Sequence, residues 1–322
     1  MATTTEVIDA QLVDRELARR RPASLWRDTL AQILRQRSAI VGLALLGILI
    51  FAAVFADVIA PFDPDAQLYA VGGVRQAGPC IHLLGCPSDQ PQFLMGLDSN
   101  ARDQFSRVLF GARISLQVGI VTVGFAIVLG TLIGAVSGYL GGWTDNILMR
   151  IMDVVLAFPA LILAIAIVLA VTAAEIPLLD NRLLAAQFAI GIVAIPVYAR
   201  VMRASVLSIR ERDFITASRA LGDSTAGILF RRILPNALTP LIVQGTLGIA
   251  GAILEVAALS FIGVAAQPPT AEWGSMIGAE RNALFSAPHL IIFPGIALSL
   301  SVLGFNLLGD GLRDALDPRL NR

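Results

Sequence analysis

The residues able to do chemistry in this 322-residue chain are few, and their spacing excludes most kinds of enzyme. All 24 basic residues are arginine, so the chain has no P-loop lysine for nucleotide phosphates and no amine for Schiff-base chemistry. The two histidines, His82 and His289, fit no zinc-ligand spacing, and no GxSxG nucleophile elbow occurs. We therefore expect no catalysis, no metal site and no cofactor. If ATP drives this protein, another protein must hydrolyse it.

Glu255 is the carboxylate that we place deep inside an apolar stretch. A charged group there costs about 2.5–3.5 kcal/mol on insertion scales, so we expect it to face water or another helix. Gln244 lies 11 residues earlier, about three helical turns, so both side chains share one face. Two interpretations stay open: both residues line a solute pathway, or Glu255 lies near the helix end and reaches the membrane surface.

The only two cysteines, Cys80 and Cys86, lie close together in a stretch that contains proline and glycine. On the outer face of a membrane, where the compartment is oxidising, such a pair can form a small disulfide loop. Two free thiols are a second interpretation. A metal site is the third, although it would need more ligands than Cys80, Cys86 and His82.

The composition indicates that these residues belong to an integral membrane protein. Hydrophobic residues make up 56% of the chain and charged residues 15%, below the roughly 25% charged residues of soluble domains. Lipid admits only helices or closed barrels, and the alternation of barrel strands is absent, so we predict an all-α fold. Six stretches reach the length of about 20 residues that a transmembrane helix needs: 38–60, 114–138, 147–172, 183–204, 238–261 and 290–308. Pro159 and Pro196 lie inside two of them and should kink them.

The placement of arginine predicts which side of the membrane each connection faces. With six spans, 18 of the 24 arginines fall on the side of both termini and of the connection between the fourth and fifth spans, and 6 fall on the other. Because positive residues favour the inside, we predict cytoplasmic N- and C-termini in a bacterial or archaeal cytoplasmic (inner) membrane. The net charge is zero, so nothing favours a nucleic-acid partner.

The predicted spans also define the domain organisation. The stretch 25–35 has the spacing of an interfacial helix on the membrane surface, or is a frayed tail with chance periodicity. The stretch 262–288, which bears prolines and a tryptophan, suggests an ordered, non-helical outer lid or a plain connection. The parts are 1–37, a cytoplasmic segment; 38–60, the first span; 61–113, an extracytoplasmic loop; 114–309, a five-helix core with a cytoplasmic loop at 205–237; and 310–322, a cytoplasmic tail.

Residues 200–237 form a polar, arginine-rich segment between the fourth and fifth spans. The segment is too long and too regular to be a tether, and its pattern predicts two short helices. Gly222 permits a tight turn between them, and Pro235 favours the end of the second helix. A rigid connection on one membrane face is what a membrane protein needs if another protein pushes on it.

This segment resembles the cytoplasmic loop signature of binding-protein-dependent ABC importer permeases, which is written EAA, three residues, G, nine residues, IxLP. Gly222 and Pro235 occupy the matching positions, whereas Thr216, Ser218 and Arg232 replace the Glu, the second Ala and the Ile. Over roughly residues 94–319 the chain is similar to the C-type permease of the dipeptide, oligopeptide and nickel branch. The stretches that carry this similarity are GLDSNARD at 96–103, RALG at 219–222, FRRILPNAL at 230–238, QPPTAEWGSM at 267–276 and DALDPR at 314–319.

The resemblance implies a non-catalytic subunit with the type I ABC importer permease fold. The implied partners are a homologous second permease subunit, two cytoplasmic ABC ATPase subunits and an extracytoplasmic substrate-binding protein, in membrane lipid. Closure of the ATPases would switch the permeases between inward- and outward-open states. The implied ATPase-coupling residues, with Asp213 and Arg219 at the rim, are Asp213, Thr216, Ala217, Ser218, Arg219, Leu221, Gly222 and Pro235.

Within this resemblance the expected solutes are di- or oligopeptides, with nickel chelates or another small solute of the same branch as the alternative. A secondary transporter is a hypothesis of a different class, although that class often shows inverted repeats and several intramembrane charges. A membrane scaffold that only recruits an ATPase is a third hypothesis, and it would not need a polar residue in the fifth span.

Overall fold

In the computed structural model, residues 34, 36–87, 89, 91–176, 179 and 181–316 are described, and their regular secondary structure is helical apart from two isolated β-bridges. Five helical segments are long and apolar enough to cross a membrane, and a bent pair of helices supplies up to one more. The predicted all-α architecture is therefore confirmed. The segments are α3 (Arg37–Val54), α5 (Gln104–Leu140), α8 (Arg182–Arg210), Thr225–Phe261, α13 (His289–Leu316), and the pair α6 (Gly142–Leu156) and α7 (Ala160–Ala173). The predicted interfacial helix at 25–35 lies almost entirely outside the described residues.

Helices α5 and α8 form the centre of the bundle, and small residues bring their backbones together. Gly130, Gly134 and Gly138 recur every four residues along the face of α5 that meets α8. A Cβ atom on Gly134 would lie 2.2 Å from the carbonyl oxygen of Ala199, so no larger residue fits at this distance. Lipid offers little hydrophobic driving force between helices, and close backbone packing of this kind therefore stabilises the contact.

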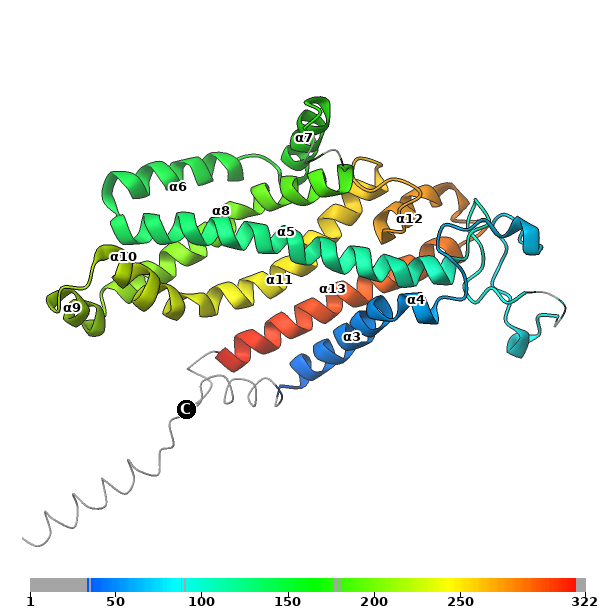
Figure 1. Ribbon diagram of the computed structural model, residues 1–322, viewed down its shortest axis with the longest axis horizontal. Coiled ribbons are helices and arrows are strands. Elements are labelled where there is room, and N and C mark those ends of the chain that lie inside the picture. Colours follow the sequence, from blue (N-terminus) through cyan, green and yellow to red (C-terminus); the bar gives the residue numbers. More distant parts are fainter. Residues whose placement is uncertain are drawn as a thin grey trace, which may run out of the picture.

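The predicted third span differs most from the structure, because α6 and α7 meet at an angle of 93°. Helix α6 lies along α5 and α8, whereas α7 stands across the bundle (Figure 1). Pro159 caps the start of α7 and lacks an N–H group, so the helix breaks at residues 157–159 and resumes in a new direction. The predicted kink is thus a full break, whereas α8 continues as one helix through Pro196.

The second and fifth spans are longer than predicted, so the loops beside them are shorter. Helix α5 begins at Gln104 instead of 114, and the Asp103 carboxylate caps it by accepting hydrogen bonds from the N–H and hydroxyl of Ser106, both at 2.7 Å. The stop expected at Pro235 is wrong. A helical run continues through this proline in three parts: α10 (Thr225–Gly227), the π-helical turn η4 (Ile228–Ile233) and α11 (Leu234–Phe261). The wider π turn just before Pro235 accommodates a ring that would crowd a regular α-helix.

The bundle has two distinct ends (Figure 1). One end carries the α5–α6 turn and the short helix α9 (Asp213–Ala220), and we call it the α9 end. The other carries α12 (Trp273–Ala279) and the loop that follows the short helix α4 (Ala56–Ile59), and we call it the α12 end. This loop contains two short 3-10 turns, η1 (Leu68–Val71) and η2 (His82–Leu84), and a third turn, η5 (Arg281–Ala283), follows α12.

Candidate functional site

The α9 end displays a short helix and a tight turn, residues 213–224, which we call the α9 tip. A single apolar side chain anchors the helix: Ile215 is fully buried and belongs to a cluster that includes Ile209, Ile228 and Ile233. Asp213 lies in the first turn, where a negative charge interacts favourably with the helix dipole. The tip is therefore fixed to the bundle by one face of α9, and its opposite face is free.

Gly222 ends α9 in a geometry that only glycine adopts without strain. Its φ is +85°, in the left-handed region. The N–H of Gly222 donates to the carbonyl of Arg219 at 3.1 Å, and the N–H of Asp223 donates to the carbonyl of Ser218 at 3.2 Å. This pair of bonds is a Schellman motif, which satisfies the carbonyls at the end of the helix. The predicted break at Gly222 is thus confirmed.

A polar contact joins two of the residues that depart from the loop signature. The hydroxyl of Ser218 donates to the carboxylate of Asp223, and the guanidinium of Arg232 lies 3.5 Å from the same carboxylate oxygen. The Ser218 hydrogen bond is the main cause that lowers the pKa of Asp223, and Arg232 adds to it. Ser218, Asp223 and Arg232 form a group that we call the tip latch. It links the end of α9 to the start of the next helical run.

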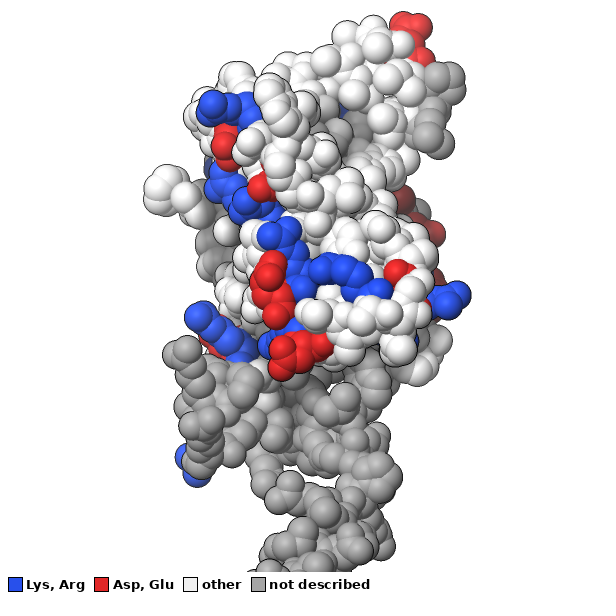
Figure 2. Space-filling model, turned by 90° about the vertical axis from the view of Figure 1, so that its left-hand side faces the viewer, with Lys and Arg blue, Asp and Glu red and all other residues white. Residues whose placement is uncertain are grey.

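The free face of the tip combines charged, small and apolar side chains. Leu221 projects from the turn with 87% of its surface exposed. Seen from the α9 end, acidic and basic side chains gather in a band across a mostly uncharged surface (Figure 2). Of the predicted coupling residues, Asp213, Thr216, Ala217, Arg219, Leu221 and Gly222 are exposed at the tip, Ser218 is buried, and Pro235 belongs to the first turn of α11.

The two residues predicted to line a pathway, Gln244 and Glu255, lie half-buried on α11. Their 11-residue spacing places them on one face, together with Gly248 and Gly251. Gly251 is exposed, and nothing in the described part of the chain lies within 4 Å of a Cβ added there. This face of α11 is therefore small, polar and open at Gly251, unlike the apolar exposed face of α3.

Four charged residues inside the third and fourth predicted spans were missed by sequence reasoning, which singled out Glu255. Arg150 and Asp153 lie on α6, and Arg200 and Arg203 lie on α8. Arg200 pairs with Asp153 at 2.5 Å, and Arg203 pairs with Asp145 at 2.6 Å. The sequence did carry a signal. Arg150 and Asp153 are three residues apart, as are Arg200 and Arg203, and this spacing places the two charges of each helix on one face.

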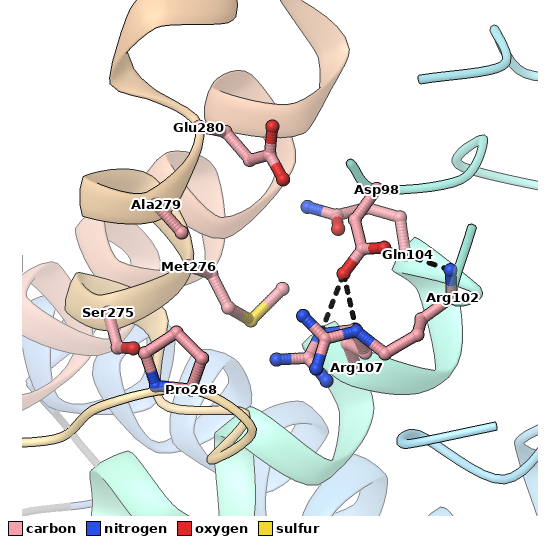
Figure 3. A pocket seen from close by; sticks show the side chains of 9 residues that line it. All are labelled: Asp98, Arg102, Gln104, Arg107, Pro268, Ser275, Met276, Ala279 and Glu280. Atoms are coloured by element: carbon pink, nitrogen blue, oxygen red, sulfur yellow. Dashed lines mark hydrogen bonds and ion pairs between the residues drawn. The ribbon is translucent and has the colours of Figure 1, made fainter. Parts of the chain in front are cut away.

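At the α12 end, buried charged side chains lie between the loop after α4 and α12 (Figure 3). Asp98 accepts from the Nε atom of Arg102 at 2.7 Å and lies 3.7 Å from Nε of Arg107. Glu280 accepts hydrogen bonds from the N–H and hydroxyl of Ser99, at 3.0 and 2.5 Å. We call these residues the outer clamp. Since Asp98, Arg102, Arg107 and Glu280 are all buried, each of them depends on its partners.

The predicted outer lid is ordered but not free of helix. Trp273 begins α12, is fully buried, and donates from its indole nitrogen to the carbonyl of Val108 at 3.1 Å. The carboxylate of Glu272 caps α12 by accepting from the N–H groups of Gly274 and Ser275, and its burial raises its pKa. The sequence signals for a helix were weak here because α12 has only seven residues.

Cys80 and Cys86 are joined as a disulfide in the loop of the α12 end, with Cα atoms 5.4 Å apart. Cys80 also forms an isolated β-bridge with Phe93 through two backbone hydrogen bonds, of 2.9 and 3.0 Å. The described residues contain no group of three or more His, Cys, Asp and Glu side chains that could hold a metal ion.

Comparison with known proteins supplies the family. A model of the binding-protein-dependent transport system inner membrane component matches residues 130–322, and one of the N-terminal TM domain of oligopeptide transport permease C matches residues 24–77. The chain is 44% identical to a dipeptide transport system permease protein of Alkalihalophilus pseudofirmus, over 92% of this chain and 91% of the relative. It is 41% identical to a di/tripeptide transport system permease protein of Pseudomonas aeruginosa, over 88% and 89%. It is 40% identical to a glutathione transport system permease protein of Escherichia coli, over 92% and 91%. The chain therefore belongs to the family of binding-protein-dependent transport system inner membrane components.

Proposed function

We propose that this chain is the permease subunit of an ATP-driven importer of small peptides. The observation that carries the proposal is the α9 tip, an exposed helix that is fixed at both ends by Ile215 and by the turn at Gly222. Such an element transmits force without bending. The relatives named for dipeptides, di- or tripeptides and glutathione support peptides as the solute class. Nickel chelates or another small solute of the same branch are the alternative.

The energy source lies in other subunits. The chain contains no lysine and therefore no P-loop, so ATP hydrolysis belongs to two cytoplasmic ABC ATPase subunits that dock on the α9 tip. Leu221, Ala217 and Thr216 would contact an ATPase groove, with Asp213 and Arg219 at the rim of the contact. A homologous second permease completes the membrane part, and a substrate-binding protein delivers the solute at the α12 end.

In this arrangement the α9 end faces the cytoplasm, and both termini lie on that side of the cytoplasmic membrane. The bias of 18 arginines against 6 supports this orientation. The disulfide between Cys80 and Cys86 then lies on the outer, oxidising side, which agrees with the usual distribution of disulfides.

Glu255 and Gln244 would line the pathway at the open face of α11. Glu255→Ala should then change the rate or the solute range of uptake, because the carboxylate meets the solute or its water. Unchanged uptake of every solute by this variant would favour the alternative in which Glu255 only reaches toward the membrane surface.

Reconstitution of the purified complex into liposomes tests the proposed function. Dipeptide uptake should require ATP and the ATPase subunits, and it should stop when the ATPases carry an inactivated P-loop lysine. If the chain alone accumulates the dipeptide without ATP, it is a secondary transporter and the proposal fails. A complex that binds the ATPases but never moves a solute would instead indicate a scaffold.

A further inference from the structure

A charged groove runs between α6 and α8, away from both the α9 tip and the outer clamp. Its volume is about 700 Å³, and it is lined by Asp145, Asn146, Met149, Arg150, Asp153, Arg200 and Arg203. Two of its ion pairs cross from one helix to the other, between Asp145 and Arg203 and between Asp153 and Arg200. These pairs are not equivalent, and the difference shows which groups are available to a ligand.

The Asp145 pair is complete and holds the groove together. The carboxylate of Asp145 accepts two hydrogen bonds from Arg203, at Nε and Nη2, both of 2.6 Å, and a third from the hydroxyl of Ser137. Fork-to-fork contacts of this kind are the strongest and most specific arginine–carboxylate geometry. Only 15% of the Asp145 side chain is exposed, so it is a structural part of the wall.

The Asp153 pair, in contrast, is open. It rests on one hydrogen bond from Nη2 of Arg200, and its two side chains are 52% and 49% exposed. Arg150 is exposed on the same groove and has no hydrogen-bond or ion-pair partner among the described residues. Three arginines face two aspartates, so the groove has a net charge of +1 and most of its unused groups are hydrogen-bond donors.

These charges lie on α8 and on the α6–α7 pair, which are long and apolar enough to cross a membrane. Arg200 precedes the end of α8 at Arg210 by ten residues, which is about 15 Å along the helix. By contrast, the exposed side chains of α3, such as Ile48, Phe51 and Val54, are apolar and suit contact with acyl chains. Half-exposed arginine and aspartate within a span are costly in hydrocarbon, so this groove faces water, a polar solute or another protein chain.

We propose that the α6–α8 groove is a water-filled part of the solute pathway, in which Arg150 and Arg200 bind the free carboxylate of a peptide. The inference rests on the proposed function and names the group that the pathway recognises. A guanidinium matches a carboxylate in shape and charge. The groove is long enough, since Asp145 and Asp153 are eight residues or about 12 Å apart, and an extended di- or tripeptide spans roughly 7–11 Å.

Cysteine labelling of the full-length chain in nanodiscs tests the groove without requiring transport. Asn146→Cys places a thiol in the groove, and Ile48→Cys places one on the apolar face of α3 as the matched control. The reagent is a charged, water-soluble methanethiosulfonate, and the parent chain gives the background from its own cysteines. Asn146→Cys should react about tenfold faster or more than Ile48→Cys, because thiolates form in water and not in apolar surroundings.

The ligand is then tested by protection. Millimolar alanyl-alanine should slow labelling of Asn146→Cys several-fold, its C-terminal amide should not, and the added change Arg150→Gln should abolish the protection. Labelling as slow as that of Ile48→Cys would overturn the proposal, because lipid or protein would then fill the groove. Equal protection by acid and amide, or protection that survives Arg150→Gln, would also overturn it. Neither result depends on ATP-driven uptake, so a failure of the proposed function is recognised separately.

Discussion

The two ends of this molecule treat charge in opposite ways. At the α12 end, Asp98, Arg107 and Glu280 are buried, and each has a polar partner: Asp98 and Arg107 lie beside each other, and Glu280 accepts from Ser99, 181 residues away. At the α9 tip, Asp213 and Arg219 are exposed, and the anchor is one apolar side chain. Buried ions tolerate a single arrangement because each lost partner leaves an uncompensated charge. Exposed ions tolerate many arrangements, because water compensates their charge.

This contrast teaches how the chain divides its tasks. The outer clamp fixes the loop after α4 against α12. The tip keeps a defined shape through its helix cap yet leaves most of its surface free for a partner. The proposed coupling role requires this combination of a fixed α12 end and an exposed tip of defined shape.

The largest effect is expected at the outer clamp. Asp98→Ala removes the buried carboxylate beside Arg102 and Arg107 and leaves them only the exposed Asp65, so the free energy of unfolding should fall by about 3–5 kcal/mol. Thermal unfolding in detergent measures this loss. The control is Asp57→Ala, which removes the partner of Arg113 in an exposed pair and should cost about 0.2–1 kcal/mol. Equal losses in both variants would contradict the contrast between the ends.

A change at the tip should affect transport more than stability. Gly222 and Gly263 end their helices with the same Schellman pattern, at φ of +85° and +80°, and a Cβ atom meets nothing within 4 Å at either. Valine should therefore cost each site a similar roughly 1–2 kcal/mol. Gly222→Val should nevertheless abolish uptake while membrane insertion persists, because the tip loses its shape, whereas Gly263→Val should retain most uptake. Uptake per ATP hydrolysed in liposomes is the readout, and normal coupling in Gly222→Val would refute the role of the tip.

The tip latch should contribute less to the stability of the tip than the turn at Gly222 does. Ser218→Ala removes the hydrogen bond to Asp223, worth about 0.5–1.5 kcal/mol, and restores the residue of the family signature. Uptake should stay near normal, while amide exchange at Gly222 and Asp223 should become faster. Thr216→Ala is the control, because its exposed hydroxyl makes no hydrogen bond in the described part of the chain. Unchanged amide exchange in Ser218→Ala would show that the tip latch does not stabilise the turn.

The smallest effects should be those of pH, and they have opposite signs at the two ends. The pKa of Asp223 is lowered from 3.8 by Ser218 and Arg232, so its contribution is complete above that value and is lost as pH falls through the lowered pKa. The pKa of Glu272 is raised above 4.5 by burial, so stability should rise as pH falls from neutral through the raised pKa. Thermal unfolding against pH should show this rise, and Glu272→Gln should remove it. If stability still rises with falling pH in Glu272→Gln, another titratable group causes the pH dependence.

Much of the α9 end could be predicted from sequence, because its determinants are local. The break at Gly222 follows from a backbone conformation that few other residues adopt, and the apolar spans follow from composition. The continuation through Pro235 could not be predicted by the same reasoning, since a local rule for proline ignores the π turn before it. The sharp break at Pro159 was underestimated for the same reason: a proline signals a bend but not its angle.

The α12 end and the α6–α8 groove depend on contacts that a linear pattern does not contain. Ser99 and Glu280 are 181 residues apart, and neither has a reason to be buried until the other is present. Likewise, Asp153 is a costly residue in an isolated span and becomes understandable only beside Arg200. Judging each span by its own hydropathy therefore missed the groove.

The most direct test of the coupling role is photo-crosslinking from the tip in the assembled, transport-competent complex. A photoreactive residue at Leu221, which is 87% exposed at the tip, is compared with one at Leu83, which is 94% exposed in the loop of the α12 end. We predict an adduct with an ATPase subunit from position 221 and none from position 83. A complex that transports peptide but gives no ATPase adduct from position 221 would contradict this account.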